Sequence, residues 1–119
     1  MIRNGGQVTY EMRNDVLVVR VGGEIDHHSA AMVRKSIDDR ILAERPERVL
    51  LELSSVDFMD SSGRGLIMGR YTLLDSFGGE TVLLNPTERI RKILDLAGFA
   101  RICRVEVVKR KEGENHVKA

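Results

Sequence analysis

The chain has 119 residues, 42% of them hydrophobic, which is enough for one compact domain and too few for two ordinary ones. Its formal net charge is +1, so no global field attracts it to nucleic acid or to a membrane surface. The single cysteine, Cys103, excludes an internal disulfide and a multi-cysteine metal site, and we expect it to be a small apolar strand residue.

Two short runs near the N-terminus predict a β-hairpin. Residues 8–13 alternate loosely between apolar and polar side chains, and residues 16–21 are rich in β-branched valine. Asn14-Asp15 between them is typical of a two-residue turn. We expect Gly22-Gly23 to end the second strand.

A helix and a buried strand are predicted after the hairpin. Asp26 or Ser29 can cap the helix, because both side chains accept hydrogen bonds from free backbone N–H groups. Pro46 prevents the helix from continuing into the apolar run 48–53, which has the length of a buried strand. The predicted apolar positions of the helix are Ala30, Met32, Val33, Ile37, Ile41 and Leu42.

The residues between this strand and the next helix are the most informative in the chain. Asp60, Ser61 and Ser62 can each accept hydrogen bonds from a first helical turn. Capping uses only one of these side chains, so a serine hydroxyl is available for another role. The position favours such a role, because ligands and reactive groups gather at the carboxyl ends of strands in open α/β sheets. We expect the helix to stop at Gly78-Gly79. Its apolar positions are Leu66, Ile67, Met68, Tyr71, Leu73 and Leu74.

The last third of the chain predicts a strand, a helix and a final strand. Residues 80–84 form an apolar run, and residues 85–88 are a helix-start signal with a proline near the first turn. Gly98 is expected to stop this helix, and residues 102–108 are expected to form the last strand. Residues 109–119 have no apolar face and predict a frayed charged tail. The apolar stripe of the helix is Ile90, Ile93, Leu94 and Leu96.

The predicted order of elements is β-β-α-β-α-β-α-β. A hairpin followed by alternating strands and helices is typical of an α/β domain with a mixed β-sheet, packed helices and right-handed crossovers. We predict a single domain over residues 1–119 with an ordered core at about 8–108.

Four separated motifs resemble one known family. They are Gly23-Glu24-Ile25-Asp26-His27-His28-Ser29-Ala30, Phe58-Met59-Asp60-Ser61-Ser62-Gly63, Gly69-Arg70-Tyr71 and Gly78-Gly79-Glu80. In this order and spacing, from about Val8 to Val107, they are similar to the anti-sigma factor antagonists of bacterial sporulation, which are members of the STAS domain family. The Asp-Ser-Ser-Gly motif alone would be a weak signal, whereas four motifs in register are specific.

The resemblance implies a STAS fold and a non-enzymatic switch in a partner-exchange pathway. In such proteins the unphosphorylated form binds an anti-sigma factor that is also a serine kinase, and a sigma factor is thereby released. The phosphorylated serine of the family maps onto Ser61, which leaves Ser62 for capping, and a serine phosphatase is a further partner. The implied partner-binding residues are Glu24, Asp26, His27, His28, Asp60, Ser61, Ser62, Gly63, Arg64 and Ile67.

A phosphate on Ser61 would act by its charge. It adds about −1.5 to −2 beside Asp60, with Asp57 and Asp26 as candidate neighbours. Because like charges brought together at an interface repel, we expect the modification to block binding locally without unfolding the domain.

The chain departs from the family in two places. Arg64 stands where close relatives carry an aliphatic residue, and the family's final helix has no evident counterpart after Val108. Arg64 could pair with a phosphate from the first helical turn. Our hypothesis is that it instead contacts an acidic residue of the partner.

Other chemistries fit the sequence less well. His27 and His28 are adjacent, so they point to different sides of a helix or strand, and we expect no metal. Neither Ser61 nor Ser62 has glycine two positions away on both sides, which disfavours a hydrolase nucleophile. Gly63-Arg64-Gly65 lacks the glycine pattern and the lysine of a phosphate-binding loop, and no cofactor is expected.

Three further functions are compatible with the sequence to different degrees. A receiver domain phosphorylated on Asp60 would carry an acidic pair after its first strand, which this chain lacks. The alternative that stays open is a nucleotide-binding or phosphoryl-accepting sensor with the same STAS fold. Without an aromatic stacking platform, the basic residues near the C-terminus predict a solvated face rather than nucleic-acid binding. They are Arg89, Arg91, Lys92, Arg101, Arg104, Lys109, Arg110 and Lys111.

The sequence also indicates where the protein acts. Its N-terminus lacks the apolar core of a signal peptide. No apolar run approaches the roughly 20 residues that span a bilayer. We therefore expect a cytoplasmic monomer that does not bind membranes.

Overall fold

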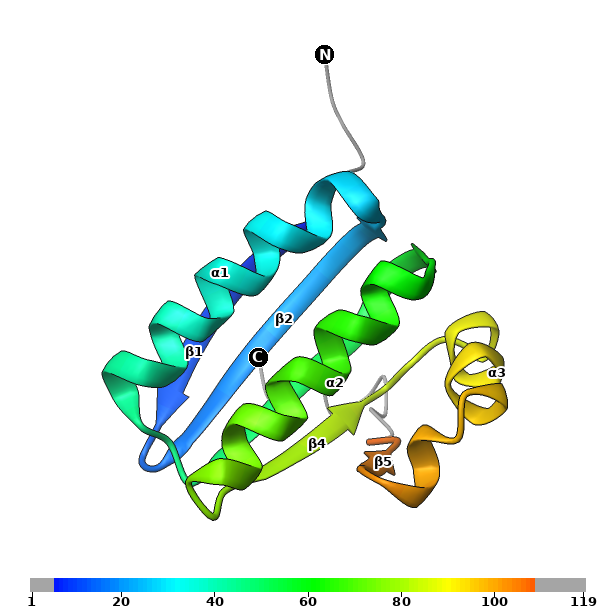
Figure 1. Ribbon diagram of the computed structural model, residues 1–119. Helices are drawn as coiled ribbons and strands as arrows, with labels where there is room; N and C mark the ends of the chain where they lie inside the picture. The colour runs from blue at the N-terminus through cyan, green and yellow to red at the C-terminus, as the bar shows by residue number, and fades with distance from the viewer. Residues whose placement is uncertain (1–5, 109–119) are drawn as a thin grey trace, which may run out of the picture.

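The computed structural model describes residues 6–108, and its elements follow the predicted order with one short 3-10 helix before the last strand (Figure 1). The strands are β1 (Gln7–Arg13), β2 (Val16–Ile25), β3 (Arg48–Met59), β4 (Glu80–Leu84) and β5 (Arg104–Glu106). The helices are α1 (His27–Glu44), α2 (Ser61–Ser76), α3 (Glu88–Leu96) and the 3-10 helix η1 (Phe99–Arg101). The predicted α/β class and element order are confirmed, while the predicted tail, residues 109–119, lies outside the described residues.

The sheet is mixed, as predicted. Its five strands lie in the order β1-β2-β3-β4-β5, with β1 antiparallel to β2 and every other neighbouring pair parallel. Helices α1 and α2 lie side by side over one face of the sheet (Figure 1). Because β2 and β3 are parallel, their carboxyl ends meet at the same end of the molecule, together with the starts of α1 and α2.

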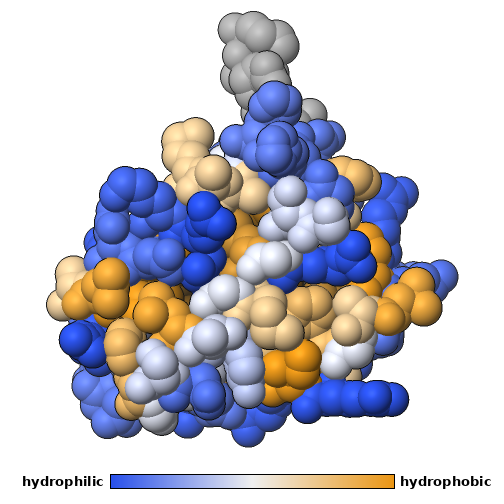
Figure 2. Space-filling view, in the orientation of Figure 1, coloured by the Kyte–Doolittle hydropathy of each residue, from blue (hydrophilic) through white to orange (hydrophobic). Residues whose placement is uncertain are grey.

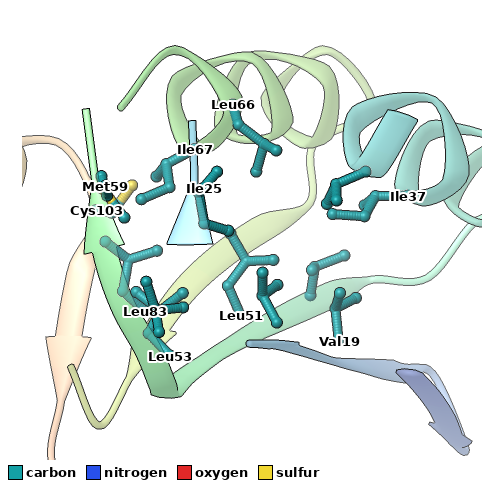
Figure 3. Close-up of a cluster of buried hydrophobic side chains, with 14 of the residues drawn as sticks. Val19, Ile25, Ile37, Leu51, Leu53, Met59, Leu66, Ile67, Leu83 and Cys103 are labelled. Carbon is teal, nitrogen blue, oxygen red and sulfur yellow. The ribbon is translucent and has the colours of Figure 1, made fainter. Parts of the chain in front are cut away.

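The core lies between this face of the sheet and the helices. On β3, Val49, Leu51 and Leu53 are buried at alternate positions, as a strand with one covered face requires. Figure 3 shows Ile37 of α1 and Leu66 of α2 directed toward the strands. The buried apolar positions of α1 are Ala30, Val33, Ile37 and Ile41. Among the helices of residues 6–108, none combines the length and apolar character needed to cross a bilayer.

Two strands are longer than predicted. β2 continues through Gly22-Gly23 to Ile25, and β3 continues beyond Leu53 to Met59. Register shifts between β2 and β3 fall on either side of the glycine pair, and Gly23 has a φ of 80°, which glycine adopts without strain. The prediction that Gly22-Gly23 ends the strand was wrong, because β2 continues to pair with β3 beyond the two glycines, with a shift in register on either side of them.

Some of the predicted apolar positions of the helices are exposed. Met32 and Leu42 lie off the line of buried positions on α1, and Leu96, the last residue of α3, is 89% exposed. The final strand spans only Arg104–Glu106 rather than residues 102–108. Cys103 is therefore buried just before a strand and not within one, and burial raises the pKa of its thiol to about 11.

A buried ion pair joins α1 to α2. Only 5% of Arg70 is exposed, and its Nε lies 2.8 Å from Oδ1 of Asp38 on α1. One terminal nitrogen of Arg70 donates to Oδ2 of Asp38 at 3.3 Å, and the other donates to the carbonyl oxygen of Leu66 at 3.2 Å. Burial lowers the pKa of Arg70, and the charge of Asp38 opposes that effect. The pair therefore holds the two helices at a defined separation.

We expect Asp38→Ala to destabilise the domain by about 3 kcal/mol, because Arg70 then stays buried without its carboxylate. Combining Asp38→Ala with Arg70→Met should recover most of this loss, since no buried charge is left unpaired. Urea unfolding measures both, with Lys35→Ala as a control whose ion pair with Asp39 is exposed. A loss under about 0.5 kcal/mol for Asp38→Ala would show that the pair does not hold the helices.

Candidate functional site

The carboxyl ends of β2 and β3 meet beside the starts of α1 and α2. Ile25 pairs with Met59 in the parallel register, and the backbone N–H of Asp60 donates to the carbonyl oxygen of Ile25 at 3.3 Å. Asp26 and Asp60, which follow these strands, are the N-caps of the two helices. Two helix starts with their capping carboxylates therefore lie side by side at one end of the sheet (Figure 1).

Asp26 caps α1 in a reciprocal arrangement with Ser29. Its Oδ1 accepts from the backbone N–H groups of His28 and Ser29, both at 3.0 Å, and its own N–H donates to the Ser29 hydroxyl at 3.1 Å. The bond from the Ser29 backbone is the main cause that lowers the pKa of Asp26. The Ser29 hydroxyl also donates to the carbonyl oxygen of Glu24 at 2.9 Å. The helix start is thereby fixed to the end of β2.

Asp60 caps α2, and Ser62 does not. Asp60 has extended backbone angles, φ −104° and ψ −162°, and its Oδ1 accepts from the backbone N–H of Ser62 at 2.7 Å. Ser61 and Ser62 already lie within the helix, so neither has the extended backbone that an N-cap needs. The assignment of the cap to Ser62 was therefore wrong.

Ser61 is exposed at the first position of α2. The capping hydrogen bond at this helix start comes from Asp60, so a group attached to the Ser61 hydroxyl leaves that bond intact. The positive end of a helix favours an anion by roughly 0.3–1 kcal/mol at an exposed site. The position is therefore accessible to an enzyme that modifies hydroxyl groups, and an added charge there does not disturb the cap.

Gly63 is buried, so it cannot contact a partner as the sequence analysis expected. A Cβ at this position would lie 2.6 Å from Cγ of Met59 and 3.3 Å from Cβ of Ile25. Glycine is required here because the first turn of α2 packs directly on the ends of β2 and β3. The role of Gly63 is to position Ser61, not to present a surface.

Ile67 is also misplaced in the predicted partner surface. Its side chain is 1% exposed, and Figure 3 shows it pointing from α2 into the core near Ile25. It lies on the buried face of α2 with Leu66 and Leu74. A residue on this face packs the helix against the sheet and is out of reach of a partner.

The other predicted site residues do come together around Ser61. His27 and His28 are exposed at the start of α1, whereas Glu24 and Arg64 are half-buried. Glu24 pairs in register with Phe58, which is 42% exposed. Sequence reasoning missed Phe58, because β3 was expected to end before it. Figure 2 shows hydrophobic residues interspersed with hydrophilic ones on the helix-covered face, rather than gathered in one patch.

The rings of His27 and His28 lie beside each other at the start of α1. Their ring centroids lie 6.0 Å apart in an edge-to-face arrangement. Across the part of the chain that the structure describes, no three His, Cys, Asp or Glu side chains gather as metal ligands do. Their position at the first turn of α1 instead makes them part of the exposed surface beside Ser61.

A groove of about 330 Å³ separates the N-terminal halves of α1 and α2. Its lining includes His27, Ala31 and Arg34 from α1 and Ser62, Gly65 and Leu66 from α2. A larger open depression of about 870 Å³ is lined by residues at the starts of β2, β3 and β4. It therefore lies at the opposite end of the strands from Ser61, whereas the smaller groove adjoins the site.

Comparison with known proteins identifies the family to which this fold belongs. Residues 7–114 match the STAS domain family. The chain belongs to this family. The STAS domain is 40% identical over 96 residues to the anti-sigma F factor antagonist of Paenibacillus polymyxa, with 81% of this chain and 82% of that protein covered.

Two solved structures resemble this STAS domain in different chemical states. The anti-sigma factor antagonist SpoIIAA in its unphosphorylated form matches with a TM-score of 0.76 and 30% identity, covering 94% of this chain and 96% of that one. SpoIIAA of Bacillus in the phosphorylated form matches with a TM-score of 0.70 and 30% identity, covering 93% and 99%. The predicted resemblance is confirmed: this STAS domain is of the anti-sigma factor antagonist type, a class of non-catalytic regulatory proteins.

We expect Gly63→Ala to destabilise the STAS domain by about 1–2 kcal/mol, because the new methyl group overlaps Met59. Gly65→Ala is the matched control, since no atom lies within 4 Å of a Cβ built there and alanine favours the helix by about 0.5–1 kcal/mol. Urea unfolding of the two variants should shift in opposite directions. Equal shifts would show that close packing at Gly63 does not position the helix.

Proposed function

We propose that the unphosphorylated STAS domain binds an anti-sigma factor that is also a serine kinase, and so releases a sigma factor. Phosphorylation of Ser61 by that kinase blocks the binding, and a serine phosphatase restores it. The observation that carries the proposal is the exposed Ser61 hydroxyl at the start of α2, free of the capping role that Asp60 fills. Relatives of this chain are known in phosphorylated and unphosphorylated forms, which supports a modification of this type.

The electrostatics of the site favour a block by repulsion. A phosphate on Ser61 adds about −1.5 to −2 charge next to Asp60 and close to Asp26. The helix start offsets this by roughly 0.3–1 kcal/mol, whereas like charges brought together at an interface cost several kcal/mol. A net penalty of about 4 kcal/mol would weaken binding roughly a thousandfold.

The docking surface proposed here surrounds Ser61. It consists of exposed or half-exposed groups from both helix starts and from the ends of β2 and β3. Within it, Phe58 offers an aromatic side chain, which is the kind of residue that contributes most at protein interfaces. The protein acts as a cytoplasmic monomer in this proposal. The surface residues are Glu24, Asp26, His27, His28, Phe58, Asp60, Ser61, Ser62 and Arg64.

Ser61→Asp should weaken binding to the anti-sigma factor of the same organism at least tenfold, because it adds a negative charge at the position of the proposed phosphate. Ser61→Ala should bind as the unmodified protein does, since it adds no charge. Isothermal titration calorimetry measures both affinities, with circular dichroism as the check that each variant folds. Equal affinities of Ser61→Asp and Ser61→Ala would overturn the proposal.

Mapping of the modified residue gives an independent control. After incubation with the anti-sigma factor and ATP, mass spectrometry should find phosphate on Ser61 in the native chain and in Ser62→Ala, and none in Ser61→Ala. The same incubation without the anti-sigma factor should leave every chain unmodified. Phosphate that is acquired from ATP alone would instead support a phosphoryl-accepting sensor.

Arg64→Leu should weaken binding of the unphosphorylated protein about tenfold, because a half-buried arginine beside the site can pair with an acidic group of the partner. Arg13→Leu at the end of β1 is the control, since Arg13 is exposed and pairs with Val16 at the opposite end of β2 from Ser61. The same titrations measure both variants in each phosphorylation state. Unchanged binding of Arg64→Leu in both states would exclude a role for Arg64.

A further inference from the structure

The groove between α1 and α2 has two basic residues in its lining, Arg34 and His27. Arg34 and His27 stand on its α1 side, and Ser62 and Gly65 on its α2 side. None of the residues that line it is acidic. The first turns of α1 and α2, whose positive ends adjoin the groove, also contain no acidic residue beyond their N-caps. The local charge therefore favours an anionic group from outside.

Arg34 and Arg70 lie next to each other near the groove, and of these two arginines Arg70 is the one that pairs with a carboxylate in the described part of the chain. Asp38 is paired with Arg70 at 2.8 Å, and Arg34 is close enough to Arg70 to lower its pKa by charge repulsion. In the described part of the chain Arg34 has no carboxylate within 4.0 Å, although its neighbour Lys35 pairs with Asp39. One positive charge is thus left uncompensated at the junction of the two helices.

The shape of the groove suits a side chain better than a whole ligand. Its volume of about 330 Å³ is at the lower end of small-molecule sites, which are mostly deep and largely apolar. The groove is open to solvent, and no atom lies within 4 Å of a Cβ built on Gly65. A residue carried by a partner's surface can therefore enter it and approach the backbone of α2 closely.

We propose that this groove receives an acidic side chain of the anti-sigma factor, which pairs with Arg34 while the partner covers Ser61. The inference rests on the proposed function and adds the chemistry of the contact. Ser62 lines the groove, and Ser61 is its neighbour in the first turn of α2. A phosphate on Ser61 therefore stands beside the incoming carboxylate, and their repulsion gives phosphorylation its blocking effect.

Two variants test the role of the Arg34 charge, one at Arg34 and a control at its neighbour Lys35. Arg34→Gln should weaken binding of the purified anti-sigma factor at least tenfold, whereas Lys35→Gln should change it less than twofold, because both remove one charge from α1 but only Arg34 lines the groove. Raising the salt concentration should weaken binding of the native chain more than binding of Arg34→Gln. Equal affinities of the two variants would overturn the inference.

The shape of the groove is tested by a variant that does not depend on charge. Gly65→Ala should weaken binding at least fivefold while its midpoint of thermal unfolding does not fall, since its methyl group occupies the groove without touching the fold. Gly69→Ala is the matched control: a Cβ there also meets no atom within 4 Å, but Gly69 does not line the groove. Gly69→Ala should bind within twofold of the native chain.

The results separate this inference from the proposed function. If the native chain binds the anti-sigma factor, Ser61→Asp does not, and Arg34→Gln binds as Lys35→Gln does, the groove contact is wrong and the switch stands. If the native chain does not bind the anti-sigma factor, both are wrong. Loss of affinity in Arg34→Gln together with Gly65→Ala, with both controls unchanged, supports the groove contact.

Discussion

The close approach of α2 to the ends of β2 and β3 is the contact on which the site depends. Gly63 permits it, because any Cβ there would lie 2.6 Å from Cγ of Met59. The approach brings the backbone N–H of Asp60 to the carbonyl oxygen of Ile25 and so sets the start of α2 beside the start of α1. Everything proposed for Ser61 follows from this placement, since it leaves Ser61 exposed at the start of α2, beside the start of α1.

The proposed phosphate on Ser61 acts through its charge and not through a change in the shape of the domain. In the proposed switch, a phosphate on Ser61 leaves the cap made by Asp60 in place and changes the charge around the start of α2. The buried pair of Arg70 and Asp38 keeps α1 and α2 in place while this happens. Binding to such a rigid surface can be switched by charge alone. Refolding a segment would in addition cost conformational entropy.

Much of the fold could be predicted from local patterns. Three local signals correspond to elements of the structure: the valine-rich run 16–21, the run that starts at Arg48 and the stop at Gly78-Gly79. The ends of β2 and β3 could not be predicted, because the pairing of these strands carries both past the points where their apolar patterns stop. The burial of Gly63 and Ile67 was not predicted either, because it follows from the packing of α2 against the sheet and not from the motif that contains Gly63 or from the apolar position of Ile67.

The sequence by itself determined the order of elements, the four motifs and the position of a serine at a helix start. Such features depend on residues within a few positions of one another, where periodicity, caps and turns act. The tertiary structure decided that β3 continues to Met59, so that Asp60 rather than Ser62 starts α2, and that Arg34 lines a groove beside the Arg70–Asp38 pair. These facts depend on how distant segments pack, because side chains from α1 and α2 meet only after both helices lie on the sheet.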